Sequence, residues 1–79
     1  MRIEYGTVEI ETDRNGDGDA VITFKNFYTP PIVLVIALEK DMTGTFSVIE
    51  RTPKYAKIHV DGSSVTNKKL TAGWIAISH

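Results

Sequence analysis

Residues 32–38 read Ile-Val-Leu-Val-Ile-Ala-Leu, and all seven side chains are apolar. Two prolines precede this run and the turn-forming residues 40–44 follow it, so the sequence predicts a β-strand between two breaks. Even with Pro30 and Pro31 included, the apolar run is far too short to cross a bilayer. A strand without polar side chains has no face to offer water, and we expect it to be covered on both sides.

The end of the chain repeats this two-sided pattern. In the last predicted strand, residues 70–78, Trp74 and Ala76 alternate with Ile75 and Ile77, so both faces are apolar. No helical periodicity elsewhere supplies a cover for the outer faces of these two strands, whereas a neighbouring subunit would supply one. We therefore expect an interface between copies of the chain, formed by Val33, Val35, Ile75 and Ile77. A tightly wrapped barrel, whose loops cover the same faces, is the alternative.

Four further segments show alternation or short β-branched runs between turn signals: residues 3–12, 20–27, 46–50 and 55–60. In the first of them the apolar positions change parity between Tyr5 and Val8, which predicts a β-bulge at Gly6-Thr7. Six strands at short spacing, with no predicted helix, indicate one all-β domain over residues 1–79. The expected architecture is a six-stranded antiparallel β-sandwich.

Composition limits the classes of function. The 79 residues carry a net charge of −1 and include no cysteine, so disulfides and thiolate zinc sites are excluded. A chain this short barely stabilises its own core, which again favours association. The balanced charge speaks against a nucleic-acid partner, although an OB-like nucleic-acid-binding module remains an alternative. The first residues show no signal peptide, so we expect synthesis in the cytoplasm without classical secretion, and no membrane insertion.

An acidic segment, residues 13–19, joins the first two predicted strands. Four oxygen-bearing side chains stand at alternate positions: Asp13, Asn15, Asp17 and Asp19. With Gly18 after the third, this spacing matches the first half of a calcium-binding loop. However, Phe24 stands where an EF-hand supplies its bidentate glutamate, and strands rather than helices flank the segment. Calcium bound by these four residues is one interpretation, and a solvated hairpin turn is the other.

The chain offers little for catalysis. General-base chemistry near neutral pH usually needs histidine, and the two here are His59, on the outward face of an alternating strand, and the C-terminal His79. No serine or threonine lies in a strained nucleophile turn. We expect a protein that is not an enzyme, with no catalytic residues and no cofactor other than the calcium considered above.

Several strand segments resemble those of H-type lectin domains. The first match joins Val21-Ile22-Thr23-Phe24 and Phe27 to Pro31-Ile32-Val33-Leu34-Val35. Gly44-Thr45-Phe46-Ser47-Val48 is similar to the family's Gly-x-Phe-x-Val strand. Trp74-Ile75-Ala76-Ile77 is similar to its closing Trp-x-Ala-Ile strand, although Ser78 stands where glycine is frequent. The matching residues are strand and core residues, and they extend from about Ala20 to the end of the chain.

This resemblance implies a six-stranded antiparallel sandwich that assembles as a homotrimer. Family members include agglutinins that bind N-acetylgalactosamine at subunit boundaries, and similar domains occur in phage tail and fibre proteins. We therefore expect a viral structural or receptor-binding module located in the virion, with cell-surface carbohydrate or other virion proteins as partners. A purely structural tail component without a sugar site is the alternative. Exposed residues near loops are the candidate ligand contacts: Tyr28, Tyr55 and His59.

Overall fold

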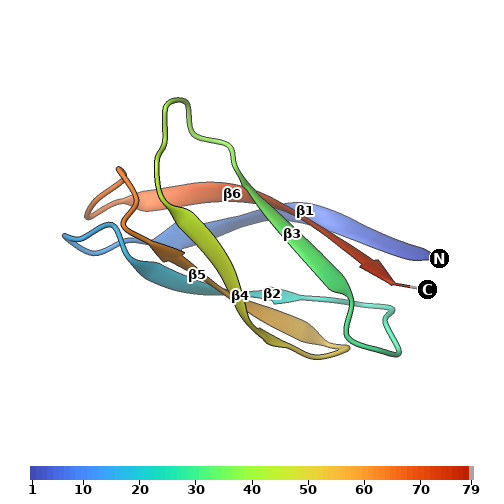
Figure 1. Ribbon diagram of the computed structural model, residues 1–79. Coiled ribbons are helices and arrows are strands. Elements are labelled where there is room, and N and C mark those ends of the chain that lie inside the picture. Colours follow the sequence, from blue (N-terminus) through green and yellow to red (C-terminus); the bar gives the residue numbers. More distant parts are fainter. Residues whose placement is uncertain (79) are drawn as a thin grey trace.

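The computed structural model describes residues 1–78, which form six β-strands (Figure 1). Their bounds are β1 (Arg2–Glu11), β2 (Gly18–Thr23), β3 (Ile32–Ala37), β4 (Thr45–Arg51), β5 (Tyr55–Asp61) and β6 (Lys69–Ser78). Within residues 1–78 there is no helix, and so none with the length and apolarity needed to cross a membrane. The prediction of an all-β fold is confirmed.

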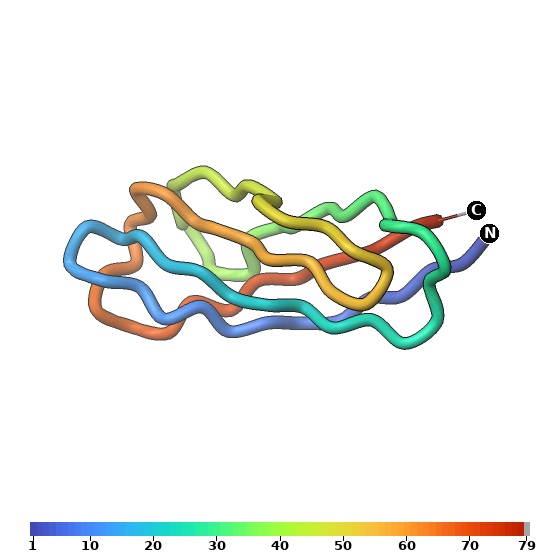
Figure 2. The backbone as a smooth tube through the Cα atoms, turned by 90° about the horizontal axis from the view of Figure 1, so that it is seen from below, coloured from blue at the N-terminus to red at the C-terminus, as the bar shows by residue number. Residues whose placement is uncertain are grey.

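The strands form two antiparallel sheets of three strands each, ordered β1-β6-β3 and β2-β5-β4. Only β4 and β5 are consecutive in the chain and paired in one sheet; every other connection crosses from one sheet to the other. The molecule is long and thin, with extents of 37 × 21 × 15 Å, and both chain ends lie at the same end of it (Figure 2). The predicted six-stranded antiparallel β-sandwich is confirmed.

The core lies between the sheets and uses alternate residues of the strands. On β5 the buried positions are Ala56, Ile58 and Val60, as the alternation predicts. The other buried hydrophobic residues are Ile10, Ile22, Phe24, Phe27, Val33, Leu70, Ala72 and Ala76. Phe24 meets Phe27 and Trp74 edge to face, with ring centroids 5.2 and 5.7 Å apart. Trp74 therefore serves core packing, and aromatic rings close one end of the sandwich.

Strand β1 is regular, so the predicted bulge at Gly6-Thr7 is wrong. Its pairing with β6 runs without a shift from Arg2↔Ser78 to Glu11↔Lys69. The parity of the apolar residues changes because the apolar residues at the two ends of the strand lie on different faces of the sheet. Ile3 and Tyr5 lie on the outer surface of the sheet, and Val8 and Ile10 face the core. The irregularity that the structure does contain lies in β4, between Val48 and Glu50.

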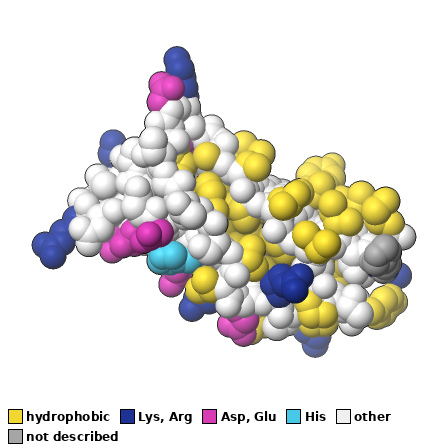
Figure 3. Space-filling model, viewed as in Figure 1, with side chains coloured by type: hydrophobic (Ala, Val, Ile, Leu, Met, Phe, Trp, Pro, Cys, Tyr) yellow, Lys and Arg dark blue, Asp and Glu magenta, His cyan; other side chains and the backbone are white. Residues whose placement is uncertain are grey.

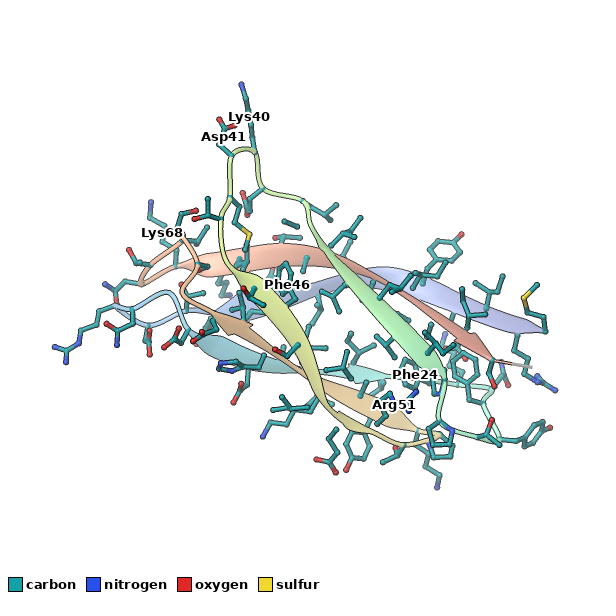
Figure 4. The ribbon with its side chains drawn as sticks, in the orientation of Figure 1. Phe24, Lys40, Asp41, Phe46, Arg51 and Lys68 are labelled. Carbon is teal, nitrogen blue, oxygen red and sulfur yellow. The ribbon has the colours of Figure 1, made fainter. Side chains whose placement is uncertain are left out.

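Strands β3 and β4 lie at the edges of their sheets, and the β3–β4 loop joins them at one end (Figure 1). At the other end Arg51 ties them together, because its Nη1 donates a hydrogen bond to the Pro31 carbonyl at 2.7 Å. Phe46 of β4 is partly buried and packs against the core (Figure 4). Lys40 and Asp41 stand at the tip of the loop, away from both sheets (Figure 4).

Candidate interaction surfaces

The outer surface of the β1-β6-β3 sheet is hydrophobic. We call it the apolar face and define it by Ile3, Tyr5, Ile32, Leu34, Ile36, Leu38, Ile75 and Ile77. The strand register places these side chains in rows, such as Tyr5–Ile75–Leu34 across all three strands. Tyr5 is 80% exposed, Leu34 55% and Ile36 60%. Figure 3 shows hydrophobic side chains gathered over the half of the molecule that carries β3 and the chain ends.

Two of the four residues predicted for an interface lie on this face, and two do not. Ile75 and Ile77 belong to the apolar face. Val33 is only 8% exposed, and Val35 packs against the core, so both point inward. Their assignment to the outer surface is corrected: Ile32, Leu34 and Ile36 occupy it instead. The error arose because β3 is apolar at every position, which leaves its sequence without the contrast that distinguishes inner from outer residues.

A hollow of about 290 Å³ opens in the apolar face next to the row Thr7–Gly73–Ile36. Leu34, Ile36, Leu38 and Ile75 form its apolar walls. Gly73 is buried beneath its neighbours, and a Cβ there would meet Ile36 Cγ1 at 3.3 Å and both Leu38 methyls at 3.5 Å. The glycine therefore lets the β3 side chains lean over β6 and shape the hollow.

The outer surface of the β2-β5-β4 sheet is polar by contrast. His59 on β5 lies between Asp19 of β2 and Ser47 of β4 in the strand register. Its Nδ1 is hydrogen-bonded to the Asp19 carboxylate, and this bond raises the pKa of His59 above its ordinary value, with the charges of Asp61 and Asp17 adding to the effect. An ion pair on an open sheet surface makes at most a small contribution to the pairing of the two strands.

The predicted ligand contacts do not form one site. Tyr55 shares the polar surface with His59, but it lies four residues along β5, roughly 13 Å away. Its hydroxyl donates to the Glu50 carboxylate, and this hydrogen bond raises the pKa of the phenol. Tyr28 stands on the loop after β2, 82% exposed, with the Arg2 guanidinium 4.8 Å above its ring centre. These three residues therefore lie at separate places on the surface of the protein.

The acidic segment forms a hydrogen-bonded loop that crosses between the sheets. Oδ1 of Asp13 accepts the N–H groups of Asn15 at 2.8 Å and Asp17 at 3.0 Å. These two bonds, that from Asp17 first, lower the pKa of Asp13. Since β1 and β2 belong to different sheets, the loop is a crossover and the hairpin interpretation is wrong. The turn itself was predicted correctly.

Contacts to the β5–β6 connection hold this loop in place. Asp17 Oδ1 accepts the Gly62 N–H at 2.7 Å, and the Gly16 carbonyl accepts the Ser63 N–H at 3.1 Å. Gly16 has a φ of 78°, and a Cβ there would lie 2.0 Å from the Ser63 carbonyl oxygen. Only glycine allows so close an approach. The sequence signals the turn, but the partner segment becomes visible only in the folded chain.

The four residues predicted to bind calcium are engaged separately. Asp13 and Asp17 accept backbone N–H groups, Asp19 pairs with His59, and Asn15 is exposed. Among residues 1–78, no three carboxylate or imidazole side chains lie close enough together to hold a metal ion. Calcium at this loop stays a prediction, and it would require these hydrogen bonds to rearrange.

Sequence reasoning missed Tyr5, Ile32, Leu34 and Ile36 as surface residues. One signal was present: Ile3 and Tyr5 stand on the opposite parity from Val8 and Ile10, which is the pattern of a strand with two partly apolar faces.

A scan of the sequence against protein-family models and a search among curated proteins both found no match. The resemblance to H-type lectin domains therefore depends on the strand residues alone.

Proposed function

We propose that this chain is a non-enzymatic module that associates with copies of itself through its apolar face, as a structural or receptor-binding part of a phage or prophage particle. The observation that carries this proposal is the apolar face itself. Hydrophobic side chains from the two outer strands of one sheet, β1 and β3, are half exposed or more, and Ile75 and Ile77 of β6 lie partly exposed between them. The outer surface of the opposite sheet is mainly polar. Contiguous apolar surface of this kind marks an interaction site.

The apolar face is large enough for a specific interface. Burying an isoleucine or leucine side chain fully is worth about 1.5–3 kcal/mol at roughly 25 cal/mol per Å², which corresponds to about 60–120 Å². Five of its aliphatic side chains are exposed by half or more; with Tyr5 they present on the order of 450 Å². Because interfaces are only about 60% apolar, each copy would bury roughly 700 Å². A pair would then bury about 1,400 Å², a typical value for stable complexes.

The surface of the isolated chain is also large for its mass. The chain exposes 5172 Å², whereas the scaling for monomeric proteins of this mass gives about 4,800 Å². Its radius of gyration is 12.5 Å, against about 11.6 Å expected for a chain of this length. Association would stabilise a thin two-sheet domain of this kind, because a neighbouring copy would cover its exposed apolar face.

The homotrimer and the particle location are proposed from the resemblance to H-type lectin domains. Three copies in a ring would present three equivalent sets of loops, and multivalency would turn weak contacts into useful avidity. Carbohydrate is the candidate ligand of such an attachment module. A purely structural role without a sugar site is the second candidate, and the separation of Tyr28, Tyr55 and His59 in the fold favours it.

The mass in solution tests the association. Light scattering of the wild-type chain at micromolar concentration is expected to give three times the monomer mass. Leu34→Lys should shift the chain to the monomer, because a buried unpaired charge weakens association at least about 100-fold. A monomer mass for the wild type at every concentration would overturn the proposal.

Val21→Lys is the matched control. Val21 is 53% exposed, nearly as much as Leu34, but it lies on the outer surface of the other sheet. The same charge placed there is expected to leave the mass unchanged. Equal loss of mass in both variants would mean that lysine destabilises the fold, and not that the apolar face forms the interface.

A glycan array separates the two proposed roles. A labelled wild-type oligomer that binds sugars saturably would establish an attachment module. The purely structural alternative predicts no saturable signal even at high protein concentration. Variants Tyr28→Ala and Tyr55→Ala then show whether either tyrosine contributes to a signal that does appear.

A further inference from the structure

Tyr5 and the hollow beside Gly73 are a knob and a hole on the same face of the chain. Tyr5 is the most exposed large side chain of the apolar face, at 80%. It lies in the row Tyr5–Ile75–Leu34, and the hollow lies at the next row, Thr7–Gly73–Ile36. Two residues along a strand correspond to about 6.8 Å. Tyr5 does not line the hollow of its own chain, so the hollow is open to another molecule.

We propose that the hollow receives the Tyr5 ring of a second copy of this chain. This inference rests on the proposed self-association and names the contact that gives it specificity. The hollow of about 290 Å³ has the volume of about ten waters, enough for a phenol ring of seven heavy atoms. Its walls are aliphatic, which suits the body of a tyrosine, while the hydroxyl at the tip can stay in water.

A second copy is the occupant that the surface chemistry favours. Each copy has one knob and one hole in adjacent rows of the same face, so a copy that docks on this face can give its knob and receive one at the same time. The two strand rows that carry the knob and the hole, Tyr5–Ile75–Leu34 and Thr7–Gly73–Ile36, contain no charged residue. The net charge of −1 also produces little repulsion between copies. Exposed tyrosines that enter apolar pockets are typical energetic centres of interfaces.

Removal of the knob tests the inference. The dissociation constant, measured by sedimentation at several concentrations, is expected to rise at least tenfold in Tyr5→Ala. Tyr5→Phe keeps the ring and should stay within about threefold of the wild type. Because Tyr5 is so exposed, its removal leaves the core intact, and circular dichroism of the diluted variant should match that of the wild type.

Tyr28→Ala is the control, since Tyr28 is equally exposed at 82% but stands on the loop after β2, outside the apolar face. It should leave the dissociation constant unchanged. Gly73→Ala tests the hole, because the added methyl group would stand in the lining of the hollow, 3.3 Å from Ile36 Cγ1 and 3.5 Å from both Leu38 methyls. In the double variant Tyr5→Ala/Gly73→Ala the two effects should be less than multiplicative, as they remove the same contact.

The outcomes distinguish the inference from the function on which it rests. A monomeric wild type overturns both. A wild-type oligomer that Tyr5→Ala leaves intact overturns the knob and hole alone, and the apolar face then associates in another geometry. Tyr28→Ala weakening association as much as Tyr5→Ala would also contradict the inference.

Discussion

The indole ring of Trp74 lies directly against the backbone of Gly6. The two residues face each other in the β1–β6 pairing, and a Cβ at Gly6 would lie 3.3 Å from Cζ2 of the ring and 3.4 Å from its nitrogen. The ring also meets Phe24 edge to face, at 5.7 Å between ring centroids. Strand β1 can therefore pass over a large inward side chain without a bulge only because residue 6 has no side chain.

Replacement of Gly6 by valine should destabilise the fold by about 1–3 kcal/mol, because the added methyl groups overpack the space that the indole occupies. Urea unfolding followed by tryptophan fluorescence measures the change in the free energy of unfolding. Thr23→Val, an exposed β-branched change on β2, should stay within about 0.5 kcal/mol. Gly6→Val with wild-type stability would show that Trp74 has room to move.

Stability should fall as pH rises through the pKa of His59. The Asp19 carboxylate raises this pKa above its usual 6.5, so the pair contributes fully below the unfolded-state value and is lost as pH rises through the folded-state value. For an exposed pair the contribution is at most about 1 kcal/mol. Melting temperatures from pH 5 to 9 test this, and they should lose most of the dependence in Asp19→Asn.

Direct titration of the imidazole checks the cause. The NMR-measured pKa of His59 should lie above 6.5 in the wild type and return toward it in Asp19→Asn. His79 lies outside the described residues, and a His79→Gln variant identifies its resonances. A wild-type value at or below 6.5 would contradict the ion pair.

Calcium should have little effect on this protein. Asp13 and Asp17 already accept backbone N–H groups, and Asp19 is paired with His59. Binding would have to replace these bonds, so titration with millimolar calcium is expected to give no heat and no change in melting temperature. A rise in melting temperature that Asp17→Asn abolishes would instead establish the calcium loop that the spacing of residues 13–19 suggests.

Much of the fold could be predicted because the turn signals in this sequence are strong. Prolines 30 and 31, the acidic segment and the Asp61-Gly62 turn separate the strands, and clean alternation in β5 identified Ala56, Ile58 and Val60 as core residues. The predicted strand boundaries agree with those of the structure to within a few residues. Little of the candidate site could be predicted in the same way, since Tyr5 and the hollow belong to strands that are far apart in the chain.

The sequence by itself determined that the apolar run at residues 32–38 forms a strand with two apolar faces, and that the domain is all-β. Only the tertiary structure decided which side chains form the apolar outer surface. Alternation distinguishes the two faces of a strand only where polar and apolar residues differ, and β3 has no such difference. Its pairing with β6, which sets Leu34 opposite Ile75 and Val33 opposite Ala76, turns Val33 inward and leaves Leu34 exposed.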